Sequence, residues 1–251
     1  MSAFYTAKRT IDIYIPGSKF PFKLSRSRIE NFISCPRCFY IDRKFGIDKP
    51  PPYPYTLSSA VDKLLKKEFD VHRANGTAHP LMKHYRIDAI PMPHKDINEW
   101  RNPRIGIRYL HKPTNLLVFG GVDDVWKDSN GRLIVVDYKS TAKASEVNID
   151  APWQIAYKRQ VEIYQWLFRQ NGFDVSDTAY FVYCNGDTDK EAFDAKLEFN
   201  IKVIPYKGSD KWIGEALTKI KACLDSSKIP NSNPDCDFCT YRKNTQSIEI
   251  S

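Results

Sequence analysis

The stretch that decides the fold runs from Leu117 to Lys143 and reads LVFGGVDDVWKDSNGRLIVVDYKSTAK. Its first part, Leu117 to Val125, is apolar and rich in strand-forming residues, and a turn cluster from Asp128 to Gly131 follows. The next part, Leu133 to Tyr138, is a continuous apolar run, which is typical of a strand buried on both faces. The sequence therefore predicts two strands joined by a turn, the second of them buried.

Two opposite charges lie at the end of the second strand. Asp137 and Lys139 are two residues apart, so their side chains leave the same face. A hairpin of this length brings Asp123, from the first strand, beside Asp137. Two carboxylates at the rim of an apolar sheet repel each other unless a cation lies between them, and their oxygens suit Mg²⁺ or Mn²⁺. A surface hairpin with an Asp–Lys salt bridge is the alternative, and spacing alone slightly favours it.

The composition bounds the possible partners. The chain has 251 residues, a formal net charge of +8 and 13% aromatic residues. These values fit a protein that binds a polyanion and stacks bases on its rings, although an ordinary basic protein has the same values. No apolar run approaches the roughly 18 residues of a membrane span, and residues 1–17 lack a signal core. We therefore expect a cytoplasmic protein without a membrane partner.

Hydrophobic periodicity predicts the other elements. Helices are expected over residues 26–34, 58–74, 152–173 and 212–224. Further strands are expected over residues 105–110, 178–184 and 197–205. We also expect a short hairpin over residues 1–24 and an irregular insertion or lid over residues 75–104. This order suits a mixed central sheet flanked by helices, in one α/β domain over residues 1–251.

Two Cys-x-x-Cys pairs lie near opposite ends of the chain, Cys35 with Cys38 and Cys236 with Cys239. Four thiolates suit one tetrahedral Zn²⁺ ion or an iron–sulfur cluster. Because the binding free energy of a structural metal contributes to folding, either group would join the N- and C-terminal segments to each other.

The motifs Gly120-Gly121-Val122-Asp123 and Val135-Val136-Asp137-Tyr138-Lys139-Ser140 resemble the catalytic core of the PD-(D/E)XK nuclease superfamily, most closely its RecB-like exonuclease branch. Gln160 and Tyr164, four residues apart, resemble the Gln-x-x-x-Tyr signature of that branch. The resemblance implies a restriction-endonuclease-like α/β core and hydrolysis of phosphodiester bonds in DNA. It makes Asp123, Asp137 and Lys139 the catalytic residues, with Gln160 and Tyr164 positioning the DNA.

The same resemblance implies a catalytic Mg²⁺ or Mn²⁺ ion. Asp123, Asp137 and the backbone carbonyl of Tyr138 would hold it. Ser58 and Asp62 take the places of the family's glycine and of its metal-binding histidine. A ligand role for Asp62 and a merely solvated Asp62 are about equally supported. If Asp62 is not a ligand, the alternative is an inactive nucleic-acid-binding or structural subunit that kept the nuclease fold.

Related nucleases of the AddAB and CRISPR spacer-acquisition types bind a 4Fe–4S cluster through one early and three late cysteines. Cys35 matches the early cysteine, and Cys236 and Cys239 match two of the late ones. The third late cysteine would fall near Thr245 and is absent, so Cys38 is the candidate fourth ligand. The resemblance slightly favours the cluster over Zn²⁺. It further implies an exonuclease acting on single strands or DNA ends in repair, recombination or CRISPR adaptation, with a helicase or CRISPR integrase as partner.

Basic residues near the predicted site are expected to follow the DNA backbone. They are Lys63, Lys66, Lys67, Arg101, Arg104, Arg108, Lys143, Lys158 and Arg159, with Trp100 among them as a ring for a base.

Overall fold

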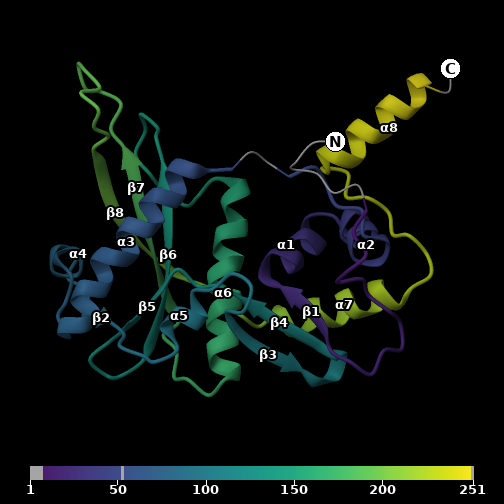
Figure 1. The fold of residues 1–251 in the computed structure, drawn as a ribbon, viewed down its shortest axis with the longest axis horizontal. Helices are drawn as coiled ribbons and strands as arrows, with labels where there is room; N and C mark the ends of the chain where they lie inside the picture. The colour runs from purple at the N-terminus through teal and green to yellow at the C-terminus, as the bar shows by residue number, and fades with distance from the viewer. Residues whose placement is uncertain (1–7, 52–53, 250–251) are drawn as a thin grey trace. The chain divides into compact units, whose positions relative to one another are not determined.

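The structure, a computed structural model, describes residues 8–51 and 54–249 (Figure 1). The chain divides into two compact units. Unit 1 consists of residues 1–53, 110–119 and 211–251, and unit 2 consists of residues 54–109 and 120–210. The single domain expected over residues 1–251 stays a prediction.

Unit 2 contains a five-stranded mixed sheet with the order β2-β5-β6-β7-β8. The strands of this sheet are β2 (Ile90–Pro91), β5 (Asp124–Lys127), β6 (Leu133–Thr141), β7 (Thr178–Gly186) and β8 (Phe199–Lys207). The helices of unit 2 are α3 (Thr56–Asn75), α4 (Pro80–His84), α5 (Ile97–Trp100), the short η2 (Pro152–Gln154) and α6 (Ile155–Gln170). β6 and β7 are parallel, and the other neighbouring strands are antiparallel. The expected mixed sheet flanked by helices is confirmed.

The hairpin predicted from the central stretch is present as β5 and β6. Asp124 lies opposite Val136 in the antiparallel register. In the turn, the Asn130 N–H donates to Asp128 Oδ1 at 3.0 Å, and Gly131 has a φ of +83°, which glycine adopts at little cost. This turn sets the register that brings the start of β5 beside the later part of β6.

The side chains of β6 alternate between two helices. Val136 and Tyr138 belong to a buried cluster with Phe69 of α3, whose ring is 5.5 Å from that of Trp126. The side chain of Asp137 projects from the opposite face of β6 and accepts a hydrogen bond from Gln160 of α6. Strand pleating therefore directs Val136 and Tyr138 to the α3 side of the sheet and Asp137 to the α6 side.

The strand expected over residues 117–125 is interrupted. The chain leaves β4 (Leu116–Gly120) and enters β5 only at Asp124. Between them, the Val122 N–H donates to the Trp100 carbonyl at 3.0 Å, and a Cβ on Gly121 would lie 3.0 Å from the Pro103 backbone. Since this turn packs against the chain around Trp100, its backbone is not available to a sheet, and Asp123 lies just outside the strand.

Residues 75–104 are more ordered than expected. They contain α4, β2 and α5, and β2 pairs with β5 at the edge of the sheet. Met82 and Trp100 are buried. The expectation of an irregular segment is wrong because its apolar side chains complete the core of unit 2. Its interpretation as an insertion or lid stays a prediction.

Unit 1 is mainly helical. Its elements are β1 (Phe22–Ser25), α1 (Arg26–Ser34), α2 (Pro36–Phe45), the short η1 (Lys112–Thr114), β4, α7 (Ile213–Asp225) and α8 (Asp237–Glu249). β1 pairs in parallel with β4, in a three-stranded sheet of order β1-β4-β3. The chain passes from unit 2 to unit 1 within β3 (Ile107–His111) and returns at the end of β4.

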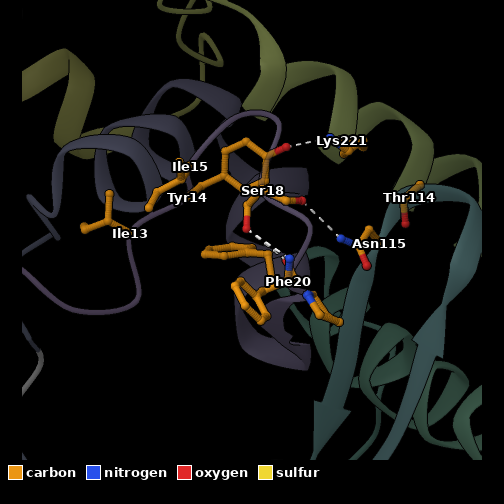
Figure 2. Close-up of a pocket in the computed structure, with 10 residues that line it drawn as sticks. Ile13, Tyr14, Ile15, Ser18, Phe20, Thr114, Asn115 and Lys221 are labelled. Atoms are coloured by element: carbon orange, nitrogen blue, oxygen red, sulfur yellow. Dashed lines mark hydrogen bonds between the residues drawn. The ribbon is translucent and has the colours of Figure 1, made fainter.

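The hairpin expected over residues 1–24 is wrong for the part that the structure describes, and residues 1–7 lie outside it. Residues 11–15 form no strand, although Gly17 makes the expected turn with a φ of +74°. Tyr14 instead reaches α7, where its hydroxyl accepts from Lys221 Nζ at 2.6 Å (Figure 2). The same hydroxyl donates to Asp225 Oδ1 at 2.5 Å. β1 has its partner in β4, a long way along the chain, so no local hairpin forms.

None of the helices within residues 8–51 and 54–249 has the length and apolar character needed to cross a bilayer.

Candidate active site and four-cysteine cluster

Asp137 and Lys139 form an ion pair on the face of β6 that meets α6. Asp137 is fully buried, and Gln160 Nε2 donates to its Oδ1 at 2.7 Å. Lys139 Nζ also lies 4.6 Å from the centre of the Tyr157 ring, on the first turn of α6. The buried carboxylate therefore has a cation and an amide donor, which burial of a charge requires.

Asp123 joins this pair through the backbone of β6. Its Oδ2 accepts the Tyr138 N–H at 3.0 Å, between the two residues of the ion pair. Burial lowers the pKa of Lys139, but the charges of Asp137 and Asp123 raise it more, so the net pKa of Lys139 is raised. The lysine is therefore a persistent ammonium ion beside two carboxylates.

Asp62 reaches the same place through Lys66, one turn further along α3. Lys66 Nζ lies 2.8 Å from the Asp62 carboxylate and 3.6 Å from Asp123 Oδ1. Asp62 is therefore linked to Asp123 by an ammonium group. The basic residue Lys66, expected to follow DNA, is part of the site itself.

Tyr164 acts on the turn before Asp123. Its hydroxyl donates to the Gly121 carbonyl at 2.6 Å. One turn earlier on α6, Gln160 holds Asp137. The two residues of the Gln-x-x-x-Tyr pair thus fix the two segments that carry the two carboxylates.

A buried charge network beneath the site was missed by the sequence reasoning. Asp124 is fully buried and pairs with both Arg73 and Arg101, the latter at 2.9 Å. The Tyr138 hydroxyl donates to Asp124 Oδ2 at 2.7 Å, and burial together with that carboxylate raises the pKa of Tyr138. Arg101 Nε also donates to the Asp123 carbonyl at 3.1 Å. The network therefore holds the backbone carbonyl of Asp123 and the side chain of Tyr138, the residue that follows Asp137.

Two residues expected on the DNA path lie elsewhere. Trp100 is buried and stacks on His94 with ring centres 4.1 Å apart, so it offers no face to a base. Arg101 already pairs with two carboxylates, that of Asp124 and that of Asp70 at 2.8 Å, so it is not free to bind a DNA phosphate. The sequence did contain a sign of the buried acid. Asp123 and Asp124 are adjacent at the start of a strand, where neighbouring side chains point to opposite faces, so one of the two is expected to point into the core.

The donor set fits a hard divalent cation in chemical type. Asp123, Asp137 and Asp62 supply carboxylate oxygens, and two lysines gather among them, as concentrated negative charge requires. Within the described parts of the chain, the four cysteines are the group whose ligand atoms lie close enough together for one ion. The three carboxylates instead have their lysines as partners.

The four cysteines converge in unit 1. Cys35 lies between α1 and α2, Cys38 within α2, and Cys236 and Cys239 at the start of α8. Their sulfur atoms all lie within 4.8 Å of one another, with Cys38 Sγ 3.6 Å from that of Cys236 and 3.5 Å from that of Cys239. The expected joining of N- and C-terminal segments at a four-cysteine site is confirmed as an arrangement of ligands.

Backbone groups favour a thiolate within this cluster. Burial raises the pKa of Cys35, but hydrogen bonds from the backbone N–H groups of Cys38 and Asn233 together have a larger, opposite effect. The net pKa of Cys35 is lowered to about 7. The Asn233 side chain also donates to the Ser34 carbonyl at 3.1 Å. The two ends of the chain thus meet through ordinary hydrogen bonds as well as through sulfur.

Comparison with known proteins identifies the family. A family model described as the PD-(D/E)XK nuclease superfamily matches residues 56–243. No curated protein matches the chain. Among solved structures, the crystal structure of SSO0001 is similar over 88% of this chain and 84% of its own, at 15% identity and a TM-score of 0.40. Because the family match covers most of the sequence, the chain belongs to the PD-(D/E)XK nuclease superfamily.

Proposed function

We propose that this protein is a metal-dependent DNA nuclease of the RecB-like branch, which hydrolyses phosphodiester bonds. The observation that carries the proposal is the meeting of Asp123, Asp137 and Lys139 at one place, with Lys139 paired to Asp137 and Asp123 bonded to the peptide between them. Exonuclease action on single strands or DNA ends, a role in repair, recombination or CRISPR adaptation, and a helicase or integrase partner stay predictions.

In this proposal, Asp123, Asp137 and the Tyr138 carbonyl hold one or two Mg²⁺ or Mn²⁺ ions. When bound, such an ion polarises the phosphate and lowers the pKa of a coordinated water. The ammonium group of Lys139 orients the attacking water or offsets charge on the phosphate. Gln160 and Tyr164 keep the two acids in place for the reaction.

Asp62 is the proposed further ligand, in the place of the family histidine. Lys66 now bridges Asp62 and Asp123, and it becomes available to a DNA phosphate when a cation takes those carboxylates. Asp62→Ala would then lower the affinity for the metal, so that cleavage needs a higher metal concentration. Glu68→Ala, one to two turns away on the same helix, is the matched control. Unchanged metal affinity and activity in Asp62→Ala would leave Asp62 as no more than the partner of Lys66.

For the four-cysteine cluster we propose one tetrahedral ion, Zn²⁺, rather than the 4Fe–4S cluster that the resemblance favours. Zn–S bonds of about 2.3 Å place tetrahedral sulfurs about 3.8 Å apart. The closest sulfur pairs here are at 3.5 and 3.6 Å, and Cys35 Sγ lies 3.8 Å from Cys239 Sγ. A cubane cluster binds each thiolate to a different iron, which needs wider spacing. The visible absorption spectrum of freshly purified protein distinguishes the two groups. An absorption band at about 400 nm, which makes the protein brown, would indicate an iron–sulfur cluster and contradict zinc.

The test of the activity is incubation of labelled single- and double-stranded DNA with Mg²⁺, with Mn²⁺ and without either ion. We expect metal-dependent cleavage that Lys139→Ala abolishes. The second candidate is an inactive nucleic-acid-binding subunit. It is supported by the aspartate at position 62, where the family has a metal-binding histidine, and by the pairing of this carboxylate with a lysine. DNA binding without cleavage under every ion would select that candidate.

A further inference from the structure

Two neighbouring hollows lie in unit 1 beside the four-cysteine cluster. Their volumes are about 520 Å³ and about 210 Å³, and Arg37, Cys239 and Arg242 line both. Apolar side chains wall the larger hollow, namely Ile41, Phe45, Ile47, Ile229 and Phe238. Polar and basic side chains surround the smaller one, including Ser232, Lys243 and Gln246. An apolar hollow therefore adjoins a cationic one, and two arginines connect them.

The apolar wall is open to solvent. Phe45, Ile47 and Phe238 keep 45%, 44% and 47% of their surface exposed. Exposed apolar side chains that gather in a hollow with a polar rim are typical of a binding site. The helix α8, which carries Phe238, has no buried residue, so its side chains remain accessible to a ligand.

The rim is positively charged. Arg242 and Lys243 make no ion pair within residues 8–51 and 54–249, and Lys49 Nζ lies 4.9 Å from the centre of the Phe238 ring. The acidic residue on the rim, Asp48, is neutralised by Arg28 at 2.8 Å. The occupant should therefore be an anion with an apolar or aromatic part.

The spacing along α8 combines these two properties. Phe238 and Arg242 are four residues apart, so they lie on one face of the helix. A ring and a guanidinium group side by side match one nucleotide of a single strand, whose base stacks while its phosphate is paired. A base pair inside a duplex is stacked on both faces, so it has no free face to offer to Phe238.

We propose that these hollows bind single-stranded DNA, with a base against Phe238 in the larger hollow and the neighbouring phosphates at Arg242 and Lys243. This inference rests on the proposed function for its substrate class. It assigns a DNA-binding surface to unit 1, in addition to the predicted catalytic residues of unit 2.

The test is fluorescence anisotropy of the full chain with a short labelled oligothymidylate, without added divalent ion. Phe238→Ala is expected to weaken binding about fivefold to a hundredfold, as loss of one base–ring stack does. The matched control is Phe20→Ala, whose ring is 83% exposed on the same unit outside both hollows. Arg242→Gln is expected to lower the log–log salt slope by about 0.7, the share of one phosphate contact. Lys112→Gln, also exposed on unit 1, should leave the slope unchanged.

The folded state is monitored by the metal content of the cysteine cluster, and Arg242→Lys should retain the salt slope. Wild-type affinity and slope in Phe238→Ala and Arg242→Gln, or equal losses in the two controls, would overturn the inference. The proposed function fails differently: it is refuted when no ion supports cleavage, even if these variants bind DNA as expected here.

Discussion

The acidic site of unit 2 and the four-cysteine cluster of unit 1 both gather groups that bind cations, but they balance charge differently. At the acidic site, Lys139 and Lys66 pair with the carboxylates, so the chain supplies its own cations. In the cluster, the sulfurs have one another and backbone N–H groups as partners. We infer that unit 2 folds without its ion and needs it for chemistry, whereas unit 1 needs its ion to fold.

The largest expected effect tests the second half of that comparison. Cys239→Ser should release the metal and lower the free energy of unfolding by several kcal/mol, since metal binding is coupled to folding. Cys223→Ser, a partly buried cysteine on α7 outside the cluster, is the matched control. Metal analysis and thermal unfolding with and without a chelator measure both. Full metal content in Cys239→Ser would contradict a metal site at the four cysteines.

The next effect separates charge balance from chemistry in unit 2. Lys139→Met should lower the cleavage rate about a hundredfold to a thousandfold, since it removes an electrostatic group from the reaction. It should also cost about 3–5 kcal/mol of stability, because buried Asp137 loses its cation. The double variant Asp137→Asn with Lys139→Met should recover stability but not activity.

Lys207→Met, an exposed lysine on β8, controls for loss of one positive charge. Thermal unfolding and single-turnover cleavage are the two measurements. If Lys139→Met is as stable as the wild type, the pair does not balance charge as we infer.

A third prediction concerns the network that supports the acidic site. Asp124→Asn should destabilise the protein by about 3 kcal/mol, because Arg73 and Arg101 lose a buried partner. Asp177→Asn, which breaks an exposed pair with Arg169, should cost less than about 1 kcal/mol. Chemical denaturation compares them. Equal effects would mean that the network is not a structural support.

The smallest effect tests the positioning of Asp123. Tyr164→Phe removes the hydrogen bond to the Gly121 carbonyl and should cost about 1 kcal/mol, or up to about tenfold in rate. Tyr109→Phe is the control, because the contact of that side chain is a ring packed edge-on against Trp166 at 5.5 Å. Steady-state cleavage rates measure both variants. A slower Tyr109→Phe with an unchanged Tyr164→Phe would contradict the role of the turn.

Local pattern predicted much of the fold because the central elements are strongly periodic. The turn at residues 128–131, the strands β6, β7 and β8 and the helices around residues 26–34 and 213–225 lie where their sequence patterns place them. The errors fall where long-range packing decides. β1 has its partner in β4 rather than in residues 11–15, and residues 121–123 bond to the chain near Trp100. No local pattern contains those partners.

The sequence by itself determined which residues could be catalytic and which could bind metal, because residue type and spacing set their chemistry and the face of the strand from which they project. Only the tertiary structure decided what those groups contact. It turned Asp124 into the core beside two arginines, placed Lys66 between Asp62 and Asp123, and brought Cys35 and Cys38 to Cys236 and Cys239. The physical reason is that the energy of a charge or a thiol depends on burial and on partners far along the chain, which spacing does not record.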